Sequence, residues 1–433
     1  MSLKFGTDGV RAEALTVLTT GYVSALSNAA AQVLGGGQWL IGRDTRESGP
    51  ALEAAVVAGL ASAGAQPVSA GVVPTPALAW ASSQRGIPAA MITASHNPWQ
   101  DNGVKFFAPG GLKLPDDVER AIEAVLDPDG AAPAGAVAAH GPLLDEYVQH
   151  LVGLGRSLVG LRVVLDCANG AMSEAAPAVF RALGADTIVI HDAPDGRNIN
   201  DRCGATHTES LSAAVVAHGA HLGLAFDGDG DRVIAVDELG NHVDGDRLIA
   251  LAALQLREEG ALHADTVVVT VMSNLGFHKA MAAAGIEVLT TAVGDRYVLE
   301  ALDAHGHSVG GEQSGHIIYR DVATTGDGLL AGMRLAEFVH EHEHELSTIA
   351  GEVMASYPQV LLNVRVRERH PRVADELAAE IAAAEASLAG DGRILVRASG
   401  TEPLIRVMVE AATAETARSV AEGLVAVVQA RFG

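Results

Sequence analysis

Three segments of the chain repeat one pattern, and this repetition limits the possible fold more than any other feature. Each segment begins with a short apolar run, continues through a polar loop into a helix-like stretch that ends at a glycine, and resumes with a second apolar run. The first runs are residues 39–41, 163–165 and 267–269, and the helical stretches end at Gly64, Gly184 and Gly285. Short strands that alternate with helices are typical of βαβ units with parallel strands. Because these glycines are 120 and 101 residues apart, each repeat is the size of a domain.

The fourth part of the chain follows another pattern. Strand-like runs at residues 360–366, 394–396 and 404–409 flank a helix-like stretch at residues 374–388 and precede a terminal helix. Strands and helices mix here without the repeated glycine, which predicts a smaller α+β domain. The predicted fold is therefore α/β, with three βαβ domains of mixed, mostly parallel sheets and a C-terminal α+β domain. The predicted domains are residues 1–150, 151–255, 256–365 and 366–433.

Charge and composition exclude several classes of protein. The chain has 53 acidic and 29 basic residues, a net charge of −24, so a basic surface for nucleic acid or anionic membrane is not expected. No apolar stretch reaches the roughly 18 residues of a membrane span, and residues 1–6 lack the apolar core of a signal peptide. Two cysteines, Cys167 and Cys203, predict neither a disulfide framework nor a zinc cluster. These features favour a cytoplasmic protein.

A serine loop follows the apolar run at residues 89–92. The loop reads Thr-Ala-Ser-His-Asn-Pro, so Ser95 lies where a strand is expected to end. A hydroxyl in that place is a candidate nucleophile or phosphoryl carrier, and Lys105, one of four lysines in the chain, is a candidate partner. An ordinary Ser/Thr turn and a solvent-facing lysine are the alternative interpretations.

Three aspartates, Asp227, Asp229 and Asp231, alternate with glycines between two apolar runs. Carboxylates at this spacing can converge on one hard cation such as Mg²⁺, and their mutual repulsion makes a bare surface loop a poor explanation. A calcium-binding loop is the alternative, with Glu238 at its last ligand position. However, that loop requires a glycine where this chain has Arg232, and it is flanked by helices rather than by strand-like runs.

Two further loops carry groups that suit a sugar phosphate. Residues 310–316, Gly-Gly-Glu-Gln-Ser-Gly-His, offer the mixture of donors and acceptors that sugar hydroxyls require. Residues 397–403, Arg-Ala-Ser-Gly-Thr-Glu-Pro, followed by Arg406, combine backbone amides, hydroxyls and guanidinium groups that suit a phosphate. Taken singly, each loop is also compatible with an ordinary surface connection.

A histidine-rich segment matches a zinc-protease pattern. Residues 340–344 read His-Glu-His-Glu-His, which would place His340 and His344 one helical turn apart. The segment alternates charge and has no apolar face, so the solvated end of a surface helix is the favoured interpretation over a zinc peptidase.

Taken together, the motifs resemble the α-D-phosphohexomutase superfamily. The resemblance extends over essentially the whole chain and preserves the order of the motifs, which makes it far more specific than any single loop. Besides the four loops above, it includes residues 5–11, 198–200, 203–207, 293–297 and 324–328. The resemblance implies four domains around a central cleft, with the C-terminal domain closing over the substrate.

The resemblance also implies roles for individual residues. Ser95 is expected to be a phosphoserine in the resting enzyme and, together with the three aspartates, to hold one Mg²⁺ per chain. Lys105 and His316 are the two candidates for the proton-transfer partner, between which the sequence does not choose, and Arg11 and Arg232 would stabilise charge near Ser95. The residues expected to bind substrate are Glu312 and Ser314 for sugar hydroxyls, and Arg397, Ser399, Gly400, Thr401 and Arg406 for the distal phosphate.

The implied reaction is an isomerisation that interconverts glucosamine 6-phosphate and glucosamine 1-phosphate, with a hexosamine 1,6-bisphosphate as intermediate and activator. It would supply amino-sugar precursors for UDP-N-acetylglucosamine and cell-wall synthesis. Gln313, residues 5–11 and the combination of Glu402, Pro403 and Arg406 favour glucosamine. A phosphomannomutase/phosphoglucomutase of the same superfamily and a non-catalytic sugar-phosphate binding protein are the alternatives. The expected partners are small sugar phosphates, without nucleic acid or membrane, and the sequence leaves a homodimer open.

Overall fold

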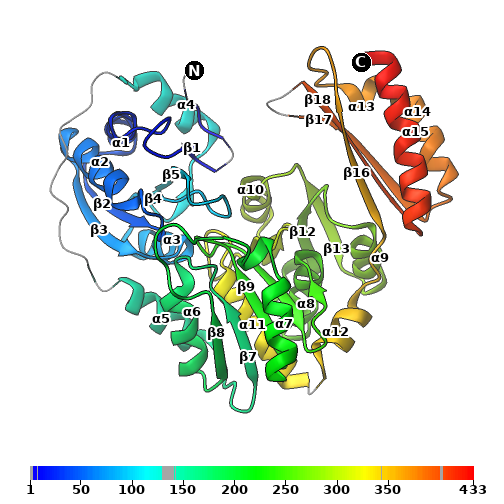
Figure 1. The fold of residues 1–433 in the computed structure, drawn as a ribbon, viewed down its shortest axis with the longest axis horizontal. Coiled ribbons are helices and arrows are strands. Elements are labelled where there is room, and N and C mark those ends of the chain that lie inside the picture. The colour runs from blue at the N-terminus through cyan, green and yellow to red at the C-terminus, as the bar shows by residue number, and fades with distance from the viewer. Residues whose placement is uncertain (1–2, 7, 129–140, 142, 343, 400–402) are drawn as a thin grey trace. The chain divides into compact units, whose positions relative to one another are not determined.

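The structure is a computed structural model that describes residues 3–6, 8–128, 141, 143–342, 344–399 and 403–433 (Figure 1). Its internal contacts divide the chain into two compact units. The first unit comprises Met1–Met272 and Gly285–Val353, and the second comprises Ser273–Ala284 and Met354–Gly433.

The first unit contains three sheets that share one topology. In each sheet, helices join three parallel strands, the first of these strands lies in the middle, and an antiparallel strand pairs with the third. The three predicted repeats are therefore confirmed as βαβ units. The sheets are mixed, because antiparallel strands extend one edge of each parallel set.

The first sheet has the strand order β1-β5-β4-β2-β3, and β6 pairs with β5. Its strands are β1 (Val10–Glu13), β2 (Gln38–Arg43), β3 (Gln66–Val72), β4 (Ala89–Ile92), β5 (Asp101–Ala108) and β6 (Leu112–Lys113), and its helices are α1 (Thr20–Leu34), α2 (Gly49–Ser62), α3 (Thr75–Arg85) and α4 (Asp116–Val125). Helices α1 and α2 pack so closely that a Cβ at Gly59 would lie 2.1 Å from the carbonyl oxygen of Ser24. Leu52 and Val56 of α2 join Ile41 of β2 in the apolar core.

The second sheet has the order β11-β10-β9-β7-β8, and the third has the order β13-β12-β14-β15. The second comprises β7 (Arg162–Asp166), β8 (Asp186–Ile190), β9 (Leu222–Phe226), β10 (Val233–Asp237) and β11 (His242–Val243), with α5 (Leu143–Leu154), α6 (Met172–Ala182), a 3-10 turn (Gly204–Thr206), α7 (Glu209–His218) and α8 (Gly245–Glu258). The third comprises β12 (Thr266–Thr270), β13 (Glu287–Thr291), β14 (Val309–Gly311) and β15 (Ile317–Tyr319), with a 3-10 turn (His263–Asp265), α10 (Asp295–His305), α11 (Gly328–His342) and α12 (Leu346–Val353).

The third strand of each parallel set ends at a loop that the sequence had singled out. The serine loop follows β4, the aspartate loop follows β9, and the 310–316 loop follows β14. Ligands of open α/β sheets bind beyond the carboxyl ends of the strands. The repeated topology therefore presents three chemically different loops at equivalent places.

The second unit has a three-stranded antiparallel sheet in the order β16-β18-β17. Its elements are α9 (Leu275–Ala283), β16 (Gln359–Arg365), α13 (Val373–Glu376), α14 (Ala378–Ser387), β17 (Gly392–Ala398), β18 (Leu404–Ala411) and α15 (Ala414–Phe432). Ala417, Ala421, Leu424 and Val428 of α15 are buried in the same apolar core as the sheet. This arrangement confirms the predicted α+β domain.

Side-chain caps mark the starts of several helices. The Thr19 hydroxyl accepts from the Tyr22 amide at α1, Asp244 accepts from the Arg247 amide at α8, and Thr413 caps α15. Such caps satisfy amides that have no partner within the helix.

None of the helices in the described residues combines the length and apolar character needed to cross a bilayer. The domain boundaries at residues 150, 255 and 365 stay predictions.

Candidate active site

Ser95 lies three residues beyond β4 and is almost fully buried. Its backbone has a φ of 52°, in the left-handed region that non-glycine residues rarely adopt. The Ser95 amide donates to Thr93 Oγ1 at 2.9 Å, and the Ser95 hydroxyl donates to Asp227 Oδ2 at 2.5 Å. The candidate nucleophile therefore points at the aspartate loop, which belongs to a different sheet.

Arg46 holds the serine loop in this conformation. Its fully buried guanidinium group pairs with Asp44 and donates to the carbonyl oxygens of Ser95 and Asn97 at 2.9 and 2.8 Å. It also donates to the carbonyl oxygens of Pro98 and Asp101. One rigid fork of donors thus satisfies several loop carbonyls that would otherwise be buried without partners.

A second contact to the loop comes from the second sheet's domain. The Asn200 side-chain amide donates to the carbonyl oxygens of Ser95 and Asn97 at 2.8 and 3.0 Å. The aspartate loop itself approaches so closely that a Cβ at Gly228 would lie 2.6 Å from the Ser95 carbonyl oxygen. Glycine at this position therefore permits the contact between the two loops.

The three aspartates form one buried cluster. Oxygens of Asp227, Asp229 and Asp231 lie within 4.8 Å of one another. Asp229 Oδ2 accepts from Thr75 Oγ1 at 2.6 Å and from Lys105 Nζ at 2.9 Å, and Lys105 also lies 3.3 Å from Asp231 Oδ2. The other oxygen of Asp229 and of Asp231 is buried without a hydrogen bond.

The charges of this cluster are strongly coupled. Burial, together with Asp231 and Asp229, raises the pKa of Asp227 well above its usual value. Burial also opposes ionisation of Asp231, but Lys105 and His316 outweigh it and hold the pKa of Asp231 well below its usual value. Burial disfavours the Lys105 ammonium as well, yet the neighbouring carboxylates raise the pKa of Lys105 far above its usual value.

These residues fit a hard divalent cation. All the potential ligand atoms are oxygens, one oxygen each of Asp229 and Asp231 is buried without a hydrogen bond, and the Ser95 hydroxyl contacts Asp227. Mg²⁺ prefers such oxygen ligands and would relieve the repulsion between the carboxylates. The alternative of a calcium loop is not supported, because strands β9 and β10 flank the segment and Glu238 accepts hydrogen bonds from Ser347 instead.

His316 lies against the same cluster from the third sheet's domain. Its Nδ1 lies 3.6 Å from Asp231 Oδ1, and its Nε2 lies 3.3 Å from Asp295 Oδ2 and accepts from the Gly326 amide at 3.0 Å. Burial lowers the pKa of His316, but Asp295 and Asp231 outweigh burial and raise the pKa above its usual value. Asp295 also pairs with Lys113, which lies 3.1 Å from Asp8.

The two arginines predicted near Ser95 are present there. The Arg232 amide donates to Asp227 Oδ1 at 3.2 Å, and its guanidinium group lies 3.2 Å from Nδ1 of His96. Arg11 pairs with Asp8, while its Nε is buried without a hydrogen bond. Both guanidinium groups are therefore available to an anion at this site.

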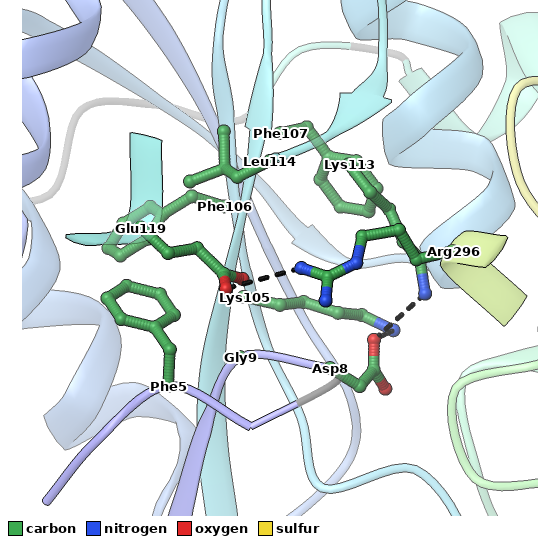
Figure 2. A pocket seen from close by; sticks show the side chains of 10 residues that line it. All are labelled: Phe5, Asp8, Gly9, Lys105, Phe106, Phe107, Lys113, Leu114, Glu119 and Arg296. Carbon is green, nitrogen blue, oxygen red and sulfur yellow. Dashed lines mark hydrogen bonds and ion pairs between the residues drawn. The ribbon is translucent and has the colours of Figure 1, made fainter. Parts of the chain in front are cut away.

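A pocket adjoins the cluster (Figure 2). Its lining residues are Phe5, Gly9, Phe106, Phe107 and Leu114, together with the charged Asp8, Lys105, Lys113, Glu119 and Arg296. Glu119 of α4 and Arg296 of α10 lie 3.4 Å apart across it. Burial raises the pKa of Glu119 to about 7, although Arg296 acts in the opposite direction. This ion pair joins the domain of the first sheet to the domain of the third.

The 310–316 loop presents its polar groups beside the aspartate loop. Glu312 accepts from the Gly294 amide at 3.1 Å, and Ser314 is exposed. A Cβ at Gly315 would lie 2.1 Å from the carbonyl oxygen of Val233, which follows the aspartates. The two loops are therefore in direct contact.

The predicted phosphate-binding residues lie in the second unit. Arg397 of β17 and Arg406 of β18 are directly opposite each other in the antiparallel register. Burial and the charge of Arg406 lower the pKa of Arg397, and Arg406 Nε is buried without a hydrogen bond. Ser399 is buried after β17, whereas Gly400 and Thr401 lie outside the described residues. Two like charges side by side favour an anionic ligand.

Several site residues were not predicted as such. Asp8, Thr75 and Asp295 contact the predicted groups directly, whereas Lys113 pairs with Asp8 and Asp295, and Arg46 positions the serine loop. The scarcity of lysine was a usable signal for Lys113, whereas nothing near Thr75 indicated its contact with Asp229. The zinc-peptidase alternative is not supported, because α11 ends at His342 and His344 lies beyond it.

Solved structures with the same fold include two mutases. A phosphoglucomutase/phosphomannomutase family protein from Burkholderia thailandensis has a TM-score of 0.82 and 24% identity, covering 98% of this chain and 97% of that chain. The N-acetylphosphoglucosamine mutase of Aspergillus fumigatus, in complex with GlcNAc-6P and magnesium, has a TM-score of 0.70 and 18% identity, covering 100% of this chain and 96% of that chain. At such identities the likeness concerns the fold alone.

Family models match the chain along its length. The alpha/beta/alpha domains I, II and III of phosphoglucomutase/phosphomannomutase match residues 2–131, 145–240 and 244–357, and the C-terminal domain of that family matches residues 361–427. Because the four matches follow one another in this order, the chain is an enzyme of the phosphohexomutase superfamily. It is an isomerase.

Curated relatives narrow this assignment. The phosphoglucosamine mutase of Frankia casuarinae is 53% identical, covering 98% of both chains, and that of Moorella thermoacetica is 50% identical, again covering 98% of both. The chain therefore belongs to the phosphoglucosamine mutase family.

Proposed function

We propose that the chain interconverts glucosamine 6-phosphate and glucosamine 1-phosphate through a phosphorylated Ser95 and a glucosamine 1,6-bisphosphate. The observation that carries the proposal is the buried Ser95 hydroxyl, 2.5 Å from Asp227 and directed at three clustered carboxylates. A serine so placed can accept and donate a phosphoryl group when a cation offsets the negative charge.

Ser95, Asp227, Asp229 and Asp231 are the proposed ligands of one Mg²⁺. When bound, this ion would neutralise charge on the phosphoryl group in transfer. Arg11 would add positive charge through its unpaired Nε, beside the Lys105 ammonium.

The reaction balances in two transfers. In the first, the bond between Ser95 Oγ and phosphorus breaks, a bond forms between the sugar O1 and phosphorus, and the O1 proton passes to the enzyme. The resulting 1,6-bisphosphate then reorients. In the second transfer, the bond between O6 and phosphorus breaks, Ser95 Oγ regains the phosphoryl group, and O6 regains a proton as glucosamine 1-phosphate leaves.

Lys105 and His316 are the proposed proton-transfer groups. Both lie beside Asp231: Lys105 Nζ is 3.3 Å from its Oδ2, and His316 Nδ1 is 3.6 Å from its Oδ1. Separate Lys105→Met and His316→Asn variants distinguish them. If His316 moves the proton, His316→Asn removes a limb of the pH profile. The raised pKa of Lys105 keeps its ionisation above the assay range, so Lys105 is assigned if only Lys105→Met lowers kcat and the limb remains in His316→Asn.

Substrate recognition is assigned to the two remaining loops. Glu312 and Ser314 are proposed to contact sugar hydroxyls, which look similar in the two orientations that the reaction requires. The groups proposed to hold the phosphate that is not reacting are Arg397, Ser399, Gly400, Thr401 and Arg406, whereas Arg232 is proposed to stabilise charge near Ser95. Binding energy at the distant phosphate positions the reacting end.

A second candidate is a phosphomannomutase/phosphoglucomutase, because the matching domain models carry those names. The identities of about 50% to phosphoglucosamine mutases support the amino sugar as the preferred substrate. A cytoplasmic location and a homodimer stay predictions from the sequence.

The test is a turnover assay with Mg²⁺, a trace of hexose 1,6-bisphosphate and glucosamine 6-phosphate, followed by phosphorus NMR. Glucose 6-phosphate and mannose 6-phosphate are assayed in parallel. Fastest conversion of the glucosamine compound, abolished by Ser95→Ala, is the expected result. Faster conversion of glucose or mannose phosphate would favour the second candidate, and conversion that survives Ser95→Ala would overturn the mechanism.

A further inference from the structure

Three potential metal ligands from separate segments meet in the domain of the second sheet, away from the aspartate cluster. Asp166 ends β7, His191 follows β8, and Cys203 precedes the 3-10 turn at Gly204–Thr206. A carboxylate oxygen, an imidazole nitrogen and the thiol sulfur lie within 4.8 Å of one another. We propose that these residues form a second metal site, for a zinc-like divalent ion rather than Mg²⁺.

The first argument is the geometry between His191 and Asp166. Nδ1 of His191 lies 3.0 Å from Asp166 Oδ1, yet this buried nitrogen makes no well-directed hydrogen bond. The nitrogen and the oxygen are close enough to each other, and to the Cys203 sulfur, to be ligands of one ion. Tetrahedral zinc ligands lie roughly 3.3–3.5 Å apart, so small side-chain adjustments would close the set.

The second argument is that Asp166 is already oriented. Its Oδ1 accepts from the Ala168 amide at 2.9 Å, and its Oδ2 accepts from the Gly204 amide at 3.0 Å. These bonds leave lone pairs free on both oxygens, because a carboxylate has about four acceptor positions. Backbone amides that fix a ligating carboxylate are the usual outer support of a metal site.

The third argument concerns the donor set and access. Nitrogen, sulfur and oxygen ligands together suit zinc and cobalt, whereas Mg²⁺ prefers oxygen alone. The His191 side chain is 29% exposed while Asp166 is fully buried, so an ion and a fourth, water ligand can enter from the His191 side. A thiol binds a metal ion as the thiolate, so binding releases its proton and should strengthen as pH rises.

The proposed site has a structural connection to the serine loop. Asn200, which donates to the Ser95 carbonyl, lies three residues before Cys203. The Asn200 amide also donates to the Ala168 carbonyl at 2.9 Å, two residues after Asp166. A bound ion would therefore tie down the segment that supports Ser95.

The test is a titration of the Mg²⁺-saturated protein with Co²⁺, which reports a thiolate ligand by a sulfur-to-cobalt charge-transfer band. Saturating Mg²⁺ occupies the aspartate cluster, and the histidines at residues 340–344 carry no sulfur. We expect the band in the wild-type protein and its loss in Cys203→Ser. Cys167→Ser is the matched control, because Cys167 is also buried and follows Asp166 directly.

His191→Ala provides a second variant, because this partly exposed side chain is less important for folding than the buried cysteine. We expect it to weaken Co²⁺ and Zn²⁺ binding by at least about tenfold, and to remove the rise in melting temperature that Zn²⁺ gives the wild-type protein. The proposal is overturned if the wild type shows no charge-transfer band, if the band survives Cys203→Ser, or if His191→Ala binds as tightly as the wild type. Loss of the band only in Cys167→Ser would also overturn it.

Discussion

The Ser95 hydroxyl donates a 2.5 Å hydrogen bond to Asp227, a residue 132 positions away in the chain. The two residues lie in the loops that follow β4 and β9 of different sheets, and both Arg46 and Asn200 donate hydrogen bonds to the Ser95 carbonyl. The proposed nucleophile and the first carboxylate of the proposed metal cluster therefore lie in direct contact, although they belong to the domains of two different sheets.

Asp227→Asn should separate metal binding from the placement of Ser95. The asparagine oxygen can still accept from Ser95, but the variant loses an anionic ligand. We expect the Mg²⁺ concentration for half-maximal activity to rise at least about tenfold, measured by titrating Mg²⁺ in the mutase assay. Asp186→Asn, a change at an exposed carboxylate of β8, is the control. An unchanged Mg²⁺ requirement in Asp227→Asn would contradict the assigned ligand set.

Lys105→Met should lower turnover without weakening Mg²⁺ binding. Lys105 carries the positive charge next to Asp229 and Asp231, so its loss removes charge stabilisation but also removes a competitor for their oxygens. We expect kcat to fall by about a hundredfold or more, measured at saturating Mg²⁺ and substrate. Lys279→Met, which alters an exposed lysine of α9, should leave kcat unchanged. A variant that loses activity only through weaker Mg²⁺ binding would refute this role.

Arg46 should be essential both for stability and for the serine loop. Arg46→Ala leaves Asp44 as a buried, unpaired charge, which should cost about 3–5 kcal/mol in the free energy of unfolding, measured by urea denaturation. Arg46→Lys restores the charge but cannot reach all the loop carbonyls. It should regain much of the stability while turnover stays low. Full activity in Arg46→Lys would show that the charge alone is sufficient.

Glu119 should make stability depend on pH. Its pKa is raised from 4.5 to about 7 in the folded protein, so the folded state binds the proton more tightly than the unfolded state. The stabilisation linked to this proton is complete below pH 4.5 and is lost as pH rises toward 7. Glu119→Gln cannot ionise, so we expect its melting temperature to rise relative to that of the wild type between pH 5 and 7. A difference that stays constant with pH would contradict the raised pKa.

The repeated domains could be predicted because their signal is local. Apolar runs, polar loops and terminating glycines lie within about 30 residues of one another in each repeat, and β2, β7 and β12 appear where the runs are. The serine loop, the aspartate loop and the 310–316 loop could also be located from the sequence, since each lies at the end of an apolar strand-like run.

The contacts between the loops could not be predicted from the same signals. Lys113 and Asp295 are 182 residues apart, and Thr75 and Asp229 are 154 residues apart. Such pairs depend on how the domains of the first unit pack, which no local pattern encodes. The cluster of Asp166, His191 and Cys203 was missed for a similar reason, because its ligands lack the close spacing of zinc motifs.

The three sheets place a nucleophile, a set of carboxylates and a sugar-binding loop after the same strand of the same topology. Different parts of each domain therefore determine the fold and the chemistry. The strands determine the fold, and a few residues after β4, β9 and β14 determine the chemistry. If residues 310–316 select the sugar as proposed, substrate preference can be changed by exchanging this loop while the proposed nucleophile, its carboxylate neighbours and the three sheets are kept.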